Sequence, residues 1–458
     1  MPFRFDTDLN LQQTLMTLEE FMTKQLMLAF SMILIAQNSH ANEVGNDAYL
    51  ENDVVKIPVV SIDTSAYRLD LQLVPNSNPV QLKLLAAKDI TELEPNTSAS
   101  SVFANNILTI PFLANAAASY KIELELISTE PTVILELKSA SATAWVNRTV
   151  KDENAITFSN VKSRLADLPD FAWESTQDLL KTNNNSSKTE GIVLKVLKGP
   201  TTQLYYDGSE SAFERGITLW ANFSQPREYL ALFYNFSDKS WALTQFDLPN
   251  LIDAPCTATE CTGGNSGIQT ADGLGVGVFG ISQKDSSDTY RYGPLQIHEY
   301  SHAAQCAPWI GLNNNPCNGQ QDMSPCWLTE GQAHFFGISG GFSTFDEYKE
   351  NRDKQINSHR VESFQDFSAA KILQFYDDDI PRACIGKPNY RLGYTLGMLT
   401  VEVLSAIGGT ESTMKIYDLA GMGQTFEDAF LNVYGISWTE AKPILADVIA
   451  TLHEDVYM

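Results

Sequence analysis

The stretch His-Glu-Tyr-Ser-His at residues 298–302 decides how the larger part of this chain is interpreted. Four residues make slightly more than one turn of an α-helix, so the imidazoles of His298 and His302 would lie on one face and bind the same metal ion. The surrounding residues favour a helix, because Pro294 suits a first turn and Pro308 forces the helix to end soon after the pentad. Two ligands do not complete a metal site, and the pattern therefore requires a third.

A second motif downstream offers the missing ligand. Residues 326–337 read Cys-Trp-Leu-Thr-Glu-Gly-Gln-Ala-His-Phe-Phe-Gly, with Pro325 placed to open a helix and Gly337 placed to close it. Glu330 lies on this helix, 28 positions after His302 (330 − 302). A hydrolytic zinc site takes three protein ligands and keeps one position open for water. A carboxylate from a second helix is therefore the kind of ligand that the pentad needs.

The pentad followed by Trp-Leu-Thr-Glu-Gly at residues 327–331 resembles the gluzincin zinc metallopeptidases. The resemblance extends over residues 285–440. It implies that His298, His302 and Glu330 bind one zinc ion per chain and that Glu299 is the general base for the attacking water. The reaction that it implies is hydrolysis of a peptide bond in a peptide or protein substrate.

Residues 390–393, Tyr-Arg-Leu-Gly, resemble the Tyr-x-x-Gly element of gluzincin aminopeptidases, whose tyrosine stabilises the oxyanion. The resemblance makes Tyr390 the second catalytic residue, with Tyr394 one helical turn later as the alternative. Thermolysin-like gluzincins place an aspartate four residues after the ligand glutamate, where this chain has His334. We interpret His334 either as a residue that supports the ligands or lines the cleft, or as a surface histidine on the ligand helix.

Two branches of the gluzincins share features with this chain. The spacing of Glu330 and the His-Glu-Tyr-x-His pentad are nearer to the bacterial collagenases, whereas the Tyr-x-x-Gly element is of the aminopeptidase type. A Gly-x-Met-Glu-Asn-like element, which holds the free amine of an aminopeptidase substrate, is absent upstream of the pentad. We therefore expect an endopeptidase, with a zinc aminopeptidase as the alternative. A non-catalytic surface-binding or adhesion protein on a degenerate peptidase scaffold is less favoured, because a scaffold has no need of Glu299 as a base.

The N-terminal segment resembles a secretory signal in its order of residue types. Lys24 precedes an apolar run from Leu26 to Ala36, and the small residues Ser39 and Ala41 follow. The apolar run is about 11 residues long, too short to span a bilayer as a helix. We expect cleavage after Ala41, with translation starting at Met1 or Met22, and a secreted or periplasmic product without stable membrane insertion.

The six cysteines all lie in the presumed catalytic half of the chain, and an even number in an exported protein favours disulfides. Cys256 with Cys261 is the local pairing that we favour. Cys306 continues the stripe of His298 and His302 by one further turn and could be a metal ligand. We favour a disulfide for Cys306, because a fourth protein ligand would close the position that water needs.

The formal net charge of −25 disfavours nucleic acids and anionic membranes as partners. It does not select a substrate. Residues 377–379, three consecutive aspartates, raise the question of a calcium site, which nothing else in the sequence supports.

One internal repeat precedes the catalytic half. The pattern Ile-Pro followed by alternating apolar and polar residues begins at Ile57 and recurs 53 positions later at Ile110 (110 − 57). Alternation over six or more residues predicts half-buried strands. We expect residues 42–145 to form a β-rich region of two related units, sandwich-like or built as paired small sheets, after a 1–41 extension and signal peptide.

Residues 146–458 are expected to form the catalytic domain, with a mixed β-rich part at 146–285 and a helical part at 286–458. The apolar runs predict strands at 191–197, 229–234 and 273–280, and helices at 343–357, 392–407, 425–434 and 437–456. In gluzincins a strand at the position of 273–280 forms the edge of the cleft, although an ordinary interior strand is the alternative. Strands followed by helices predict an α+β fold class.

Overall fold

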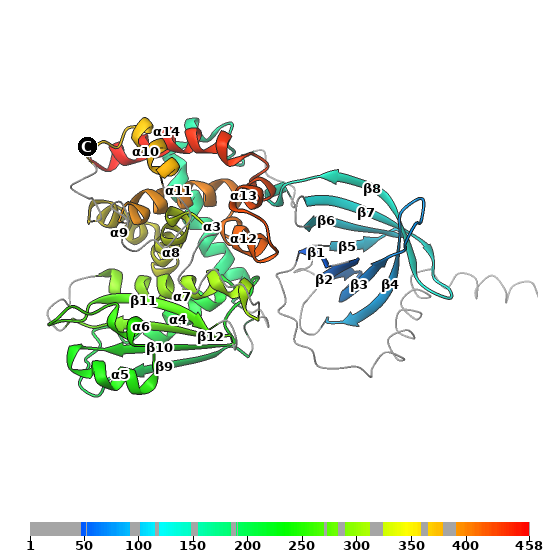
Figure 1. Cartoon of the computed structure of the whole chain (residues 1–458). Helices are drawn as coiled ribbons and strands as arrows, with labels where there is room; N and C mark the ends of the chain where they lie inside the picture. The colour runs from blue at the N-terminus through cyan, green and yellow to red at the C-terminus, as the bar shows by residue number, and fades with distance from the viewer. Residues whose placement is uncertain are drawn as a thin grey trace, which may run out of the picture. The chain divides into compact units, whose positions relative to one another are not determined.

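The structure of the chain, a computed structural model, describes residues 47–51, 53–91, 101–114, 119–147, 154–184, 189, 191–269, 273–282, 289–311, 324–358, 365–378 and 391–457. The described residues divide into two compact units, one ending at residue 142 and the other beginning at residue 143 (Figure 1). The first unit is built of strands, and the second combines a sheet with many helices, which confirms the α+β class. The predicted signal peptide lies outside the described residues and stays a prediction.

The first unit is one eight-stranded sheet that closes on itself. Its strands are β1 (Ala48–Glu51), β2 (Val54–Ile62), β3 (Ser65–Leu73), β4 (Gln81–Asp89), β5 (Ser101–Ala104), β6 (Ile107–Ala114), β7 (Ser119–Ser128) and β8 (Ile134–Ala142). They follow the order β1-β2-β3-β4-β8-β7-β6-β5, and the further pairings β1–β6 and β2–β5 join the two ends into a barrel-like sheet. The expected sandwich or pair of small sheets is therefore wrong, because β4 pairs with β8 and connects the repeats.

The sequence repeat is visible in the register of this sheet. In the first copy the β2–β3 ladder shifts between Ile57 and Val60, and in the second the β6–β7 ladder shifts between Ile110 and Leu113. Each Ile-Pro pair thus lies in a β-bulge, where a proline without an N–H group is tolerated. The apolar residues of both copies meet in a single core.

The second unit contains four strands and several helices among its described residues. They are α3 (Leu168–Asn183), β9 (Val193–Lys198), α4 (Ser209–Leu219), β10 (Glu228–Tyr234), α5 (Lys239–Gln245), α6 (Pro249–Asp253), β11 (Gly263–Gln269), β12 (Leu274–Gly280), α7 (Pro294–Cys306), α8 (Cys326–Gly341), α9 (Phe345–Ser358), α10 (Ala369–Asp378), α11 (Leu392–Gly408), α12 (Glu411–Gly421), α13 (Phe426–Tyr434) and α14 (Trp438–Tyr457). The three predicted strands and four predicted helices all occur, with boundaries shifted by a few residues.

Among the described residues, no single helix combines the length and apolar composition needed to cross a membrane, and only the bent pair α11 and α12 meets both criteria together.

The sheet of the second unit is covered on both faces, which explains its apolar strands. Alternate residues of β10 point to opposite sides: Tyr229 and Phe233 pack on Phe213 of α4, whereas Leu232 joins the core formed with α5 and α6. The strand order is β11-β12-β10-β9, with β11 antiparallel to β12. Helix α7 lies between this sheet and α8, with α11 on the far side of α8 (Figure 1).

The resemblance to gluzincins implied that residues 273–280, now β12, form the edge of the sheet, but the strand at that edge is β11. β12 is an interior strand between β11 and β10, so its alternative interpretation as an ordinary strand is correct. A Cβ atom at Gly275 or Gly277 would collide with the Tyr229 side chain, and these glycines therefore make room for a core tyrosine. The edge strand is β11, whose sequence Gly-Gly-Asn-Ser-Gly shows no strand pattern.

Glycines set the contacts of α8 with both neighbouring helices. A Cβ at Gly331 would overlap the backbone of Gly397 in α11, so the two helices cross at backbone contact. A Cβ at Gly337 would lie 2.7 Å from the carbonyl oxygen of Pro294 in α7. The prediction that Gly337 closes the helix is wrong, because α8 continues to Gly341 and Gly337 serves this close packing instead.

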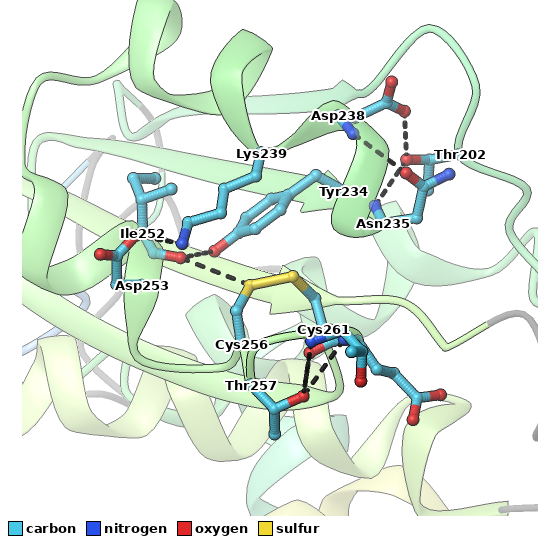
Figure 2. Close-up of a disulfide and its surroundings, with 12 residues drawn as sticks. Thr202, Tyr234, Asn235, Asp238, Lys239, Ile252, Asp253, Cys256, Thr257 and Cys261 are labelled. Carbon is cyan, nitrogen blue, oxygen red and sulfur yellow. Dashed lines mark hydrogen bonds and ion pairs between the residues drawn. A yellow bond between two sulfur atoms is a disulfide. The ribbon is translucent and has the colours of Figure 1, made fainter.

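A disulfide and its surroundings fix the segment that leads into β11. Cys256 and Cys261 are joined, as predicted, and close the loop between α6 and β11. Figure 2 shows the disulfide beside Tyr234 of β10, whose hydroxyl donates to the carbonyl oxygen of Ile252 in α6 at 2.7 Å. The disulfide thus closes the loop that leads into β11, and the Tyr234 hydrogen bond ties α6, which precedes this loop, to the sheet.

A buried ion pair joins α9 to α11. The Arg352 guanidinium donates to Glu402 (Nη2 to Oε1, 2.7 Å), and the Tyr348 hydroxyl donates to the same carboxylate at 2.5 Å. All three side chains are buried. Because a buried charge without a partner is costly, this pair orients α9 against the helix that packs on α8.

Candidate metal centre

The pentad lies on α7 with its helix start defined by local contacts. Pro294 is in the first turn as predicted, and the N–H of Gly293 donates to the side-chain Oε1 of Gln296 at 2.8 Å. The helix ends at Cys306, and Pro308 follows in a short 3-10 turn. The α-helical spacing brings the rings of His298 and His302 within 4.8 Å of each other, centroid to centroid.

Three side chains from α7 and α8 converge on one point. The Nε2 atoms of His298 and His302 are 3.1 Å apart, and Glu330 Oε2 lies 3.7 Å from the first and 3.5 Å from the second. All three residues are buried or nearly so. Among the described residues they form a group that could hold a metal ion, and it consists of the three side chains that the sequence pointed to.

The spacing of these atoms fits a small tetrahedral cation. Ligand atoms at about 2.0–2.1 Å from such an ion lie about 3.3–3.4 Å from one another along the tetrahedral edge. The measured separations of 3.1, 3.5 and 3.7 Å bracket that value. Glu330 Oε2 is moreover buried and accepts no hydrogen bond from the described residues. A cation between the three atoms would satisfy it.

A network of amides orients His302. Its Nδ1 lies 2.9 Å from the side-chain oxygen of Gln305, one turn later on α7. The amide nitrogen of Gln305 donates to the backbone oxygen of Thr329 at 2.9 Å and to Gln332 Oε1 at 2.7 Å. These two acceptors fix the amide orientation, so its oxygen must face His302 and accept a hydrogen bond from Nδ1–H. The lone pair of His302 Nε2 is thereby directed to the metal position.

His298 is oriented by a different contact. Its Nδ1 lies 2.8 Å from the hydroxyl of Tyr290, and the same hydroxyl lies 3.0 Å from Nδ1 of His334. His334 is 1% exposed and packs on the ring of Tyr394 at 5.3 Å. The interpretation of His334 as a surface histidine is therefore wrong, because α8 buries this face against α7 and α11.

Glu299 lies beside the three ligands and is buried against β11. A Cβ atom at Gly264 would overlap the Glu299 carboxylate, so the edge strand approaches this side chain as closely as a glycine permits. Gly267, three residues later in the same strand, has only Leu251 at 4.0 Å around its Cβ position. Of these two glycines, only Gly264 therefore contacts the Glu299 side chain closely.

Burial and mutual charge shift the protonation of the cluster. Burial, together with the charge of Glu330, raises the pKa of Glu299 to about 8 although His302 opposes the shift. Burial lowers the pKa of His302, but the charge of the nearby Glu330 carboxylate outweighs burial, and the pKa rises to about 9. A cation held by these side chains would oppose both shifts, because it favours neutral imidazole and ionised carboxylate.

The remaining predicted residues have different outcomes. Tyr390 lies outside the described residues, so its role stays a prediction. Tyr394 is at the site, with its ring stacked on His298 at 6.0 Å. Cys306 is in a disulfide, which excludes it as a ligand as predicted. Of the aspartates at 377–379, Asp377 pairs with Lys442, and the described residues hold no group of calcium ligands there.

Sequence reasoning missed several residues of this site. Gln305 follows His302 by three residues, and this helical spacing alone would have indicated it. Tyr290 and Gly264 carried no such signal, because a loop and an unrecognised edge strand bring them to the site.

The chain matches no protein-family model, no curated protein and no solved structure.

Proposed function

We propose that this protein is a secreted, zinc-dependent endopeptidase of gluzincin type. The observation that carries the proposal is the tetrahedral spacing of His298, His302 and Glu330, with a second carboxyl group, that of Glu299, buried beside them. Two imidazoles and one carboxylate are the ligand set of hydrolytic zinc sites, which leave one position for water. The disulfides support an oxidising compartment, as the predicted signal peptide does.

The roles of the side chains follow from their positions. Zinc, when bound, supplies a Lewis acid that polarises water and the substrate carbonyl. Glu299 accepts a proton from the attacking water and passes it to the leaving amine. Its low exposure and its raised pKa in the absence of a cation suit a group that carries a proton between two sites. Tyr390, or Tyr394 beside His298, donates to the oxyanion.

The edge strand offers a means of holding an extended substrate. Among the described residues β11 pairs with β12 alone, which leaves the backbone of its other edge for a peptide strand. Gly264 lies on this strand next to Glu299, so a peptide paired with β11 would pass close to the general base. This arrangement supports a peptide or protein as the substrate.

Two other functions have less support. A zinc aminopeptidase needs an acidic side chain, besides the ligands and the general base, to bind a free amine, and the sequence upstream of the pentad lacks the Gly-x-Met-Glu-Asn-like element that supplies it. A binding protein on a degenerate scaffold would retain neither the open three-ligand set nor a buried base.

Cleavage of a mixed peptide library tests the proposed function. We expect internal cleavage of unblocked and N-acetylated peptides alike, complete loss of cleavage with a chelator, and recovery on adding zinc. Mass spectrometry of the products distinguishes the alternatives. Release of single N-terminal residues from unblocked peptides alone would establish an aminopeptidase, and absence of any cleavage by the zinc-loaded protein would favour the binding protein.

The close approach of β11 to Glu299 predicts an effect of one methyl group. Gly264→Ala should lower peptide hydrolysis by at least about tenfold, because the new Cβ displaces the general base from its position. Zinc affinity should be unchanged, since the atoms nearest the new Cβ all belong to Glu299 and none to a ligand. Gly267→Ala on the same strand is the control and should retain the wild-type rate. Equal rates for all three proteins in a steady-state assay would show that Glu299 does not depend on Gly264.

A further inference from the structure

Tyr290 lies between two histidines that belong to different helices. It is on the 3-10 turn Thr289–Arg291, which precedes α7. Its hydroxyl contacts Nδ1 of His298 on α7 at 2.8 Å and Nδ1 of His334 on α8 at 3.0 Å. His334 follows the ligand Glu330 by four residues (334 − 330) and therefore lies one turn away on the same helix.

One arrangement of protons satisfies both of these contacts when His298 binds a metal through Nε2. Nδ1 of His298 then carries its proton and donates it to the Tyr290 oxygen. The tyrosine has a single hydrogen, which it donates to the lone pair on Nδ1 of His334. His334 is thereby the tautomer protonated on Nε2.

We propose that Tyr290 and His334 are positioning residues that orient His298 for the metal through this chain of hydrogen bonds. The inference rests on the proposed zinc site but concerns residues that do not touch the metal. These hydrogen bonds also link α7 to α8, the two helices that supply the ligands. They orient the ring of His298, as the Gln305 amide orients the ring of His302.

Groups that orient a ligand histidine alter metal affinity when they are removed, typically by 10- to 100-fold. A tyrosine that served packing alone would alter stability and leave the metal affinity unchanged. Tyr348 provides the comparison, because its buried hydroxyl donates to Glu402 rather than to a histidine of the site. Comparing variants of the two tyrosines therefore distinguishes a residue that orients a ligand from one that only stabilises the fold.

The test measures zinc affinity of the metal-free, full-length protein by competition with a chromophoric chelator. We expect Tyr290→Phe to bind zinc about 10- to 100-fold more weakly than wild type. Tyr348→Phe should bind it within about twofold of wild type, whatever its thermal stability, because it lies outside the hydrogen bonds of the ligands. The visible absorption of the cobalt-substituted protein should change in Tyr290→Phe and not in Tyr348→Phe.

Two substitutions of His334 test the acceptor independently. His334→Asn keeps an oxygen near the position of Nδ1 and should bind zinc nearly as tightly as wild type. His334→Phe removes the acceptor and should weaken zinc binding in the manner of Tyr290→Phe. If wild type binds zinc tightly and neither Tyr290→Phe nor His334→Phe weakens it, the positioning role is wrong and the proposed function stands. If wild type itself binds no zinc, the proposed function is wrong, and the inference with it.

Discussion

Replacing Glu299 by glutamine should lower peptide hydrolysis by at least about 100-fold while the protein keeps its zinc. Glutamine has nearly the same size and still fits against Gly264, but it cannot accept the proton of the attacking water. The loss should appear in kcat, because the side chain acts on the reacting water rather than in substrate binding. Steady-state kinetics on the best library peptide measure it.

The matched control is Glu174→Gln, which makes the same change of charge at an exposed position on α3. It should hydrolyse the peptide at the wild-type rate. Full activity of Glu299→Gln would remove Glu299 from the role of general base. Loss of zinc from the variant would instead assign Glu299 to the metal site.

The parts of the fold that were predictable are those in which local pattern and packing agree. Pro294 and Pro325 mark helix starts in the sequence, and α7 and α8 begin there. The apolar run at 229–234 predicts a buried strand because β10 is covered on both faces. The ligands were predictable for the same reason, since helical spacing alone places His298 beside His302.

Other features depend on tertiary contacts that the sequence does not display. The residues of β11 read as a turn, but seven consecutive pairings with β12 hold them in a strand. Gly337 reads as a helix end and is a contact point between helices. Closure of the first unit required the pairing of β4 with β8, which no local pattern of the repeat specifies.

Removing Glu330 should have the largest effect on the metal. Zinc sites in small domains bind with about 10–16 kcal/mol, so one ligand accounts for roughly 3 kcal/mol and its loss for at least about 100-fold in affinity. Glu330→Ala should therefore release zinc under conditions in which wild type retains it. The fold should persist, because the Oε2 atom of Glu330 makes no hydrogen bond among the described residues.

Glu299→Gln serves as the control for this change. It alters a second buried glutamate of the same site that is not among the ligands, and it should keep its zinc. If any change to a buried glutamate of this site released zinc, both Glu330→Ala and Glu299→Gln would lose it. The contrast between the two glutamates thus separates ligand from base.

The zinc content of the purified protein tests the central claim most directly. Wild type, Glu299→Gln and Glu330→Ala are loaded with zinc, dialysed against a weak chelator and measured by elemental analysis. The geometry of the three ligands predicts about one zinc per chain in wild type and Glu299→Gln and almost none in Glu330→Ala. Wild type without zinc, or Glu330→Ala with as much zinc as wild type, would contradict the account.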